Sequence, residues 1–161
     1  MTKAVRTVRF NIPAPYLRVD NGAAAIDFYV AVFGATEIVR LVEPNGRLAH
    51  AELRFGGDAG ITLMLSDEYP ELGLVGPKGL TSSPVALQLY VDDVDAVFAR
   101  AVNAGATVKR QPALDPFGDR VAKLVDPFGH EWMIATRVET LTPEEMAARF
   151  RAFFSVDEPL A

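Results

Sequence analysis

The fold is decided by the stretch DNGAAAIDFYVAVFGAT, residues 20–36. Its apolar residues recur at spacings of three and four, which predicts a helix over residues 23–33 that ends at Gly34. The preceding residues 20–22 form a turn or cap signal. We expect the apolar face of this helix to pack on a sheet and to hold Ala25, Ile26, Tyr29, Val30 and Phe33.

The same pattern occurs a second time in the chain. The tripeptide Gly-Ala-Thr at residues 34–36 recurs at residues 105–107, a shift of 71 residues, and each copy follows a predicted helix and precedes a predicted strand. Asp92 and Asp93 are expected to cap the second helix, over residues 94–103, and Gly105 to close it. Internal duplication is the economical explanation of this repeat.

Strands are predicted around both helices, which gives an α+β chain of two βαβββ modules. The expected strands are residues 16–19, 38–43, 48–55 and 61–65 in the first module, and 85–91, 108–111, 121–125 and 131–136 in the second. The predicted segments are a first module over 8–66, a Pro- and Gly-rich linker loop over 67–84, a second module over 85–137 and a C-terminal helix over 141–154. Thr142, Pro143 and Glu145 predict the start of that last helix.

Composition narrows the classes of function. The 161 residues are half apolar and carry a formal net charge of −5, with no run of Lys or Arg, which argues against nucleic acid and against anionic membranes as partners. The absence of cysteine excludes disulfides, thiolate metal sites and a cysteine nucleophile. No signal peptide or membrane-spanning run is visible, so we expect a cytoplasmic protein.

Three ordered motifs carry a resemblance to a known family. They are residues 25–29 with 33–35 (AIDFY and FGA), residues 90–95 (YVDDVD) and residues 126–130 (DPFGH). Together they resemble the vicinal oxygen chelate superfamily of glyoxalases, bleomycin resistance proteins and dioxygenases. GDR at 118–120 and ATR at 135–137 are similar to its PhnB-like branch. The resemblance covers about residues 8–154, and it implies curved mixed sheets around a cleft, a homodimer and a small-molecule ligand.

Metal-dependent members of that superfamily hold one divalent ion with four side chains, one from the first and one from the last strand of each module. The resemblance places these positions at Ala14, Leu63, Ala86 and Met133, none of which offers the oxygen or imidazole ligand that such an ion needs. We therefore expect no cofactor. An unusual site for a divalent metal ion would instead use His50, Glu52 and Glu131.

Strand alternation leaves the role of His50 and Glu52 open. Both residues, with Arg54, would either line a ligand site or form a solvated face. In the second case the residues that face inward are Ala49, Ala51, Leu53 and Phe55. The side chains expected to line the cleft as ligand-binding groups are Tyr16, Arg18, His50, Glu52, Gln88, Tyr90, Phe117, Arg120, Glu131 and Met133. The alternative for Tyr90 and Met133 is that they complete the core, and for Arg120 that it is an exposed turn residue.

These residues lead to three hypotheses of function. The first is metal-free binding of a small molecule, as in sequestration of a drug such as an antibiotic, or of a metabolite. The second is an enzyme, a lyase, isomerase or dioxygenase of the superfamily, using a metal ion or acid–base catalysis by Glu131. The third is a protein whose cleft is filled by its own side chains and which acts through its dimer surface.

Overall fold

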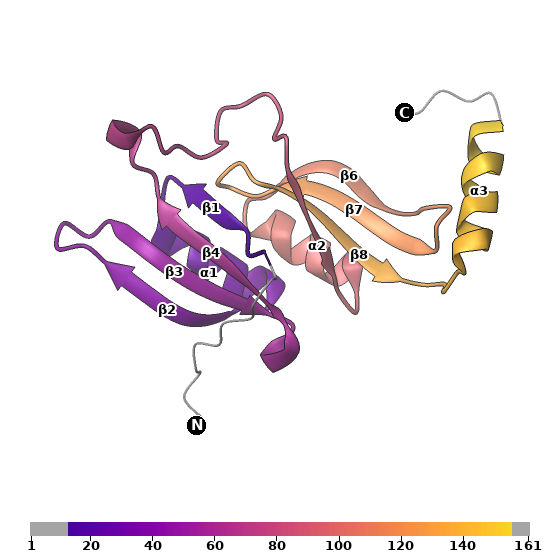
Figure 1. Cartoon of the computed structure of the whole chain (residues 1–161), viewed down its shortest axis with the longest axis horizontal. Helices are drawn as coiled ribbons and strands as arrows, with labels where there is room; N and C mark the ends of the chain where they lie inside the picture. The colour runs from indigo at the N-terminus through magenta and orange to yellow at the C-terminus, as the bar shows by residue number, and fades with distance from the viewer. Residues whose placement is uncertain (1–12, 156–161) are drawn as a thin grey trace. The chain divides into compact units, whose positions relative to one another are not determined.

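The chain folds as two units in the computed structural model, which describes residues 13–155 (Figure 1). The first unit contains residues 13–85 together with the turn 126–130, and the second contains residues 86–125 and 131–155. Each unit has its own four-stranded mixed sheet. The predicted α+β fold class is therefore confirmed, including the C-terminal helix.

The first unit follows the predicted order of one strand, one helix and three strands. Its elements are β1 (Tyr16–Val19), α1 (Gly22–Phe33), β2 (Thr36–Val42), β3 (Leu48–Phe55) and β4 (Ile61–Asp67). One short 3₁₀ helix lies between β3 and β4 at Gly57–Ala59, and a second follows β4 at Pro70–Leu72. The strands lie in the order β1-β4-β3-β2, with β1 parallel to β4 and the other neighbours antiparallel.

The helix α1 forms where its capping residues predict it. The Asn21 side chain accepts a hydrogen bond from the Ala24 N–H, and Gly34 takes the left-handed conformation, φ 69°, that closes the helix. Its buried stripe is rotated from the predicted one, because Phe28 and Val32 are buried whereas Val30 is 40% exposed. Prediction of Val30 as a core residue was therefore wrong.

The sheet of the first unit has one apolar and one polar face. Leu53 on β3 and Leu65 on β4 are fully buried on the face shared with Leu17, Ala51 and Leu63. The helix α1 contacts β2, β3 and β4 of this sheet. Because side chains alternate along a strand, Tyr16, His50, Glu52 and Ser66 belong to the opposite face. The core of the first unit thus leaves these polar side chains on the second face.

The second unit repeats this order of one strand, one helix and three strands. Its elements are β5 (Ala86–Tyr90), α2 (Val94–Asn103), β6 (Thr107–Leu114), β7 (Asp119–Val125), β8 (Glu131–Arg137) and α3 (Pro143–Ser155). The strands lie in the order β5-β8-β7-β6, and α2 contacts β6, β7 and β8. Asp93 caps α2 by accepting a hydrogen bond from the Ala96 N–H.

The DPFGH turn, residues 126–130, makes its contacts within the first unit. Asp126 accepts hydrogen bonds from the Tyr29 hydroxyl at 2.7 Å and from the backbone N–H groups of Phe128 and His130 at 2.9 Å. Burial, and then the charge and hydrogen bond of Asp126, raise the pKa of Tyr29 well above its usual value, which keeps the phenol protonated. This motif is therefore explained by packing and turn formation.

The C-terminal helix α3 begins with the predicted capping box. The Thr142 hydroxyl accepts from the Glu145 N–H at 3.2 Å, and the Glu145 carboxylate accepts from the Thr142 N–H at 2.8 Å. Between residues 13 and 155, none of the helices combines the length and the apolar character needed to span a membrane.

Candidate functional site

A row of polar side chains crosses the first sheet from β1 to β3. We call Tyr16, Arg18, His50, Glu52 and Ser66 the sheet-1 polar face. Tyr16 pairs with Met64 and Arg18 with Ser66 across the parallel β1–β4 ladder, and Glu52 pairs with Met64 from the other side. Four of the predicted ligand-binding residues therefore lie together on one surface.

Three members of the sheet-1 polar face form a chain of hydrogen bonds. The Tyr16 hydroxyl lies 3.0 Å from His50 Nδ1, and His50 Nε2 lies 3.3 Å from a carboxylate oxygen of Glu52. The Tyr16 and His50 rings are tilted by 43° with centroids 5.7 Å apart. This chain links a phenol, an imidazole and a carboxylate drawn from two strands.

Arg18 completes the sheet-1 polar face. Its guanidinium lies over the Tyr16 ring, 4.5 Å from the ring centroid, and donates a hydrogen bond to the Ser66 hydroxyl. The backbone carbonyl of Arg18 lies 2.9 Å from His130 Nε2, so the DPFGH turn also fixes this part of β1. The guanidinium pairs with no carboxylate among residues 13–155.

Burial along β3 shows that neither face of this strand is fully exposed to solvent. Glu52 and Arg54 are buried, at 4% and 9% exposure, so their face is not the solvated outer face of the sheet. A buried carboxylate requires hydrogen bonds or a counter-charge, and the His50 ring supplies one such partner to Glu52. The burial of Glu52 thus favours a built polar site.

The four positions at which the resemblance places metal ligands carry side chains without an oxygen or imidazole ligand. Leu63 is buried with Leu53 on the apolar face of the first sheet, whereas its neighbour Met64 belongs to the polar face. Ala86 and Met133 lie on neighbouring strands of the second unit, and Ala14 precedes β1. Across residues 13–155, no three His, Cys, Asp or Glu side chains gather as a metal ion requires.

The second unit brings several other predicted residues onto neighbouring strands. Gln88 on β5 pairs with Met133 on β8, which in turn pairs with Lys123 on β7. Glu131 pairs with Ala86, two residues away along the same ladder. Gln88, Met133 and Glu131 therefore share one face of the second sheet.

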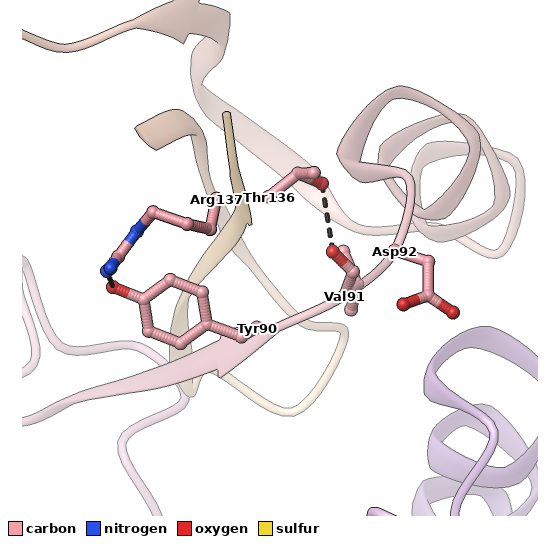
Figure 2. A pocket seen from close by; sticks show the side chains of 5 residues that line it. All are labelled: Tyr90, Val91, Asp92, Thr136 and Arg137. Atoms are coloured by element: carbon pink, nitrogen blue, oxygen red, sulfur yellow. Dashed lines mark hydrogen bonds between the residues drawn. The ribbon is translucent and has the colours of Figure 1, made fainter. Parts of the chain in front are cut away.

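Tyr90 lines a pocket at the end of β5 and β8, which we call the Tyr90 pocket. Its volume is about 350 Å³, and it is lined by Tyr90, Val91, Asp92, Thr136 and Arg137. Figure 2 shows the guanidinium of Arg137 against the Tyr90 hydroxyl, at 3.0 Å, and the Thr136 hydroxyl bonded to the Val91 carbonyl, at 2.9 Å. Tyr90 is 51% exposed, so it does not complete the core.

Charge in the Tyr90 pocket is balanced by Asp119. This carboxylate accepts hydrogen bonds from the Tyr90 hydroxyl at 2.7 Å and from Arg137 Nε. Burial alone would raise the pKa of Asp119, but the hydrogen bonds from Arg137 and Tyr90 outweigh it and hold the pKa below its usual value. Arg137 is therefore already paired with an anion of the protein itself.

Phe117 and Arg120 lie apart from the residues above. The Phe117 ring contacts Phe150 of α3, with centroids 6.1 Å apart. Arg120 forms a two-pronged ion pair with Asp95 of α2, both contacts at 2.7 Å, and its hydrogen bond holds the pKa of that carboxyl below its usual range. The structure thus places Arg120 on the helix-covered face of the second sheet, opposite Gln88 and Met133.

Three residues that take part in these networks were not predicted as site residues: Ser66, Asp119 and Arg137. Asp119 and Arg137 stand in the GDR and ATR motifs, which were used only for the family resemblance. Ser66 stands two residues after Met64, so alternation along β4 would have placed it on the polar face. Asp119 and Arg137 are direct partners across β7 and β8, a pairing that depends on the register of the two strands.

Comparison with known proteins gives consistent matches. A family model described as Glyoxalase/Bleomycin resistance protein/Dioxygenase superfamily matches residues 9–134. An uncharacterized protein of Mycobacterium bovis is 43% identical over 138 residues, which cover 84% of this chain and 89% of that protein.

Solved structures share the fold. A gene product from Arabidopsis thaliana matches with a TM-score of 0.61 at 26% identity, covering 79% of this chain and 99% of that one. The fosfomycin resistance protein FosX from Listeria monocytogenes, complexed with Mn(II) and sulfate, matches with a TM-score of 0.61 at 16% identity, covering 89% and 99%.

Proposed function

The chain belongs to the glyoxalase/bleomycin resistance protein/dioxygenase superfamily, and from that premise we propose that it binds a small anionic molecule on the sheet-1 polar face without a metal ion. In the cell, this binding would sequester a drug or a metabolite. All residues of this site belong to the first unit.

The observation that carries this proposal is the charge of Arg18. Arg40, Arg47, Arg120, Arg137 and Arg149 each pair with a carboxylate, whereas the partly buried Arg18 has only the Ser66 hydroxyl and the Tyr16 ring. A partly buried guanidinium gains most from a carboxylate or similar anion that takes its free N–H donors. An anionic ligand would therefore provide the counter-charge that residues 13–155 do not.

Two further features support a small organic ligand. Tyr16 is 44% exposed and presents an aromatic ring beside the cation, which suits a planar or partly apolar molecule. The metal-ligand positions of the superfamily carry hydrocarbon or thioether groups, which supports binding that does not depend on a divalent ion. The Tyr90 pocket is a weaker candidate for an anion, because Asp119 already neutralises Arg137.

Binding can be tested with simple carboxylates. We expect benzoate, pyruvate and 2-oxobutyrate, titrated with EDTA present, to give saturable binding by ligand-observed NMR and a rise in melting temperature. Arg18→Gln should weaken that binding at least about tenfold, since a charge-assisted hydrogen bond contributes about 1.5–3 kcal/mol.

Arg110→Gln is the matched control. It removes the same charge from an exposed residue of β6 in the second unit. If the wild-type protein and Arg18→Gln bind the carboxylates equally well, Arg18 is not the anion site. If binding requires added Mn²⁺ or Zn²⁺, the metal-independent part of the proposal is wrong.

We also infer a homodimer in the cytoplasm from family membership and composition. Superfamily resemblance implies paired chains, and the lack of cysteine is compatible with a reducing compartment.

A further inference from the structure

We propose that Tyr16, His50 and Glu52 form a proton relay that enolises a small 2-oxo acid held by Arg18. This inference rests on the proposed anion site and adds an activity and a substrate class to it. It requires no metal ion and uses only residues of the sheet-1 polar face.

The two ring nitrogens of His50 have different partners, which gives the relay a direction. An ionised carboxylate can only accept, so Glu52 favours the tautomer with the proton on Nε2. Nδ1 then presents its lone pair to the Tyr16 hydroxyl, 3.0 Å away. The Tyr16 phenol is thereby positioned to donate its proton to His50.

Burial increases stepwise along the relay. The exposed fraction falls from 44% for Tyr16 to 23% for the His50 side chain and 5% for that of Glu52. The buried carboxylate orients the imidazole through its hydrogen bond to Nε2, while the phenol stands at the accessible end. In nucleophile–base–carboxylate sites the reacting group is likewise exposed and its support is buried.

Arg18 supplies the electrostatic help that a phenolate needs. Its guanidinium lies 4.5 Å from the centre of the Tyr16 ring, so negative charge on that ring is stabilised when the proton moves to His50. The same guanidinium has N–H groups available for the carboxylate of a ligand. A substrate therefore needs a carboxylate close to an acidic C–H group, and 2-oxo acids place both within a few bonds.

The proton transfers balance without a further reactant. Tyr16 gives its proton to His50 Nδ1, and the resulting phenolate removes a proton from the carbon beside the ketone as the C–H electrons form the enolate. Exchange of the Tyr16 hydroxyl with solvent and return of that hydron to carbon restore the 2-oxo acid. The imidazolium then returns its proton to the phenolate.

The experiment is hydrogen–deuterium exchange of pyruvate and 2-oxobutyrate at C3 in D₂O with EDTA, followed by ¹H NMR. We expect wild-type protein to accelerate exchange above the buffer rate. Tyr16→Phe and His50→Gln should lose about 100-fold or more of that acceleration, the lower range for general acid–base catalysis. Tyr69→Phe is the control, because its hydroxyl bonds to Glu43 outside the sheet-1 polar face.

Glu52 is a positioning residue in this scheme, and its role has a separate readout. We expect ¹⁵N NMR of the wild-type His50 ring to show the proton on Nε2, and Glu52→Gln to alter that tautomer while lowering kcat more than it changes KM. A ring protonated on Nδ1 in the wild-type protein would overturn the relay.

Binding and exchange are measured on the same samples so that the two proposals can fail separately. If the protein binds pyruvate but exchange stays at the buffer rate, the relay is overturned and the anion site is retained. The same conclusion follows if the protein binds benzoate but binds neither 2-oxo acid. Exchange that persists in Tyr16→Phe also overturns the relay. Absence of binding by every carboxylate overturns the proposed function itself.

Discussion

Single residues decide the charge balance of the second unit, and Asp119 is the clearest case. Its side chain is 9% exposed and accepts from both Tyr90 and Arg137, whose own side chain is 45% exposed. The two donors favour the charged form of Asp119 more than burial disfavours it. The carboxylate therefore holds Tyr90 and Arg137, which line the Tyr90 pocket, in place.

We expect Asp119→Asn to lower the free energy of unfolding at pH 7 by about 1–2 kcal/mol. This is less than the full value of a hydrogen bond between charged groups, because the Arg137 side chain is partly exposed to solvent. Because the folded pKa of Asp119 is depressed, its contribution is complete above the unfolded value of about 3.9 and is lost as pH falls through the folded pKa.

Urea unfolding at pH 7 and at pH 3 measures this difference. The stability gap between wild-type protein and Asp119→Asn should narrow at pH 3. Asp92→Asn is the control, since Asp92 carries the same charge at the same pocket and is exposed. A gap that is equal at both pH values would show that Asp119 acts through packing rather than charge.

At the scale of elements, the start of α1 is joined closely to the first sheet. The Gly22 N–H donates to an Asp67 carboxylate oxygen at 2.5 Å, and the other oxygen of Asp67 accepts from the Leu48 N–H at 2.6 Å. One carboxylate at the end of β4 thus joins the first turn of α1 to the first residue of β3. Gly22 permits this approach because it has no Cβ.

Gly22→Ala should therefore destabilise the first unit. An added Cβ would lie 2.3 Å from Leu48 Cδ2, 2.8 Å from its Cβ and 2.9 Å from Asp67 Oδ1. Overpacking of this kind costs about 1–3 kcal/mol, measured as a lower denaturation midpoint. Ala23→Ser is the control and should change the denaturation midpoint little, because Ala23 is exposed. An unchanged midpoint for Gly22→Ala would contradict the prediction and show that Leu48 moves aside freely.

At the scale of the whole molecule, the chain repeats one βαβββ unit around two separate cores. Tyr29, Ile26 and Leu65 are fully buried in the first unit, and Leu124, Ile134 and Val94 in the second. The polar residues proposed to act, Tyr16, Arg18, His50 and Glu52, all belong to the first unit. The two sheets thus share a strand order but carry different polar side chains.

Homodimer formation is the prediction that belongs to this scale. Sedimentation equilibrium should give about twice the chain mass of 17.5 kDa at micromolar concentration, with or without EDTA. A mass equal to one chain across that range would contradict the expected assembly while leaving the anion site untouched.

The sequence by itself determined the elements of this protein, because their signals are local. The caps of α1, α2 and α3 lie within a few residues of the N–H groups that they bind, and the alternation along β3 separates Leu53 from Glu52 without knowledge of any other strand. The family motifs and the repeat then indicated two modules, each with one strand, one helix and three strands along the chain.

Only the tertiary structure decided which polar side chains meet. Tyr16 and His50 are 34 residues apart and Tyr90 and Asp119 are 29 apart, so their contacts depend on strand register. A shift of one residue exchanges the two faces of a strand, as the neighbours Leu63 and Met64 show. Register is set by packing of the buried faces on their helices, and that packing also leaves Arg18 beside Ser66 rather than beside a carboxylate.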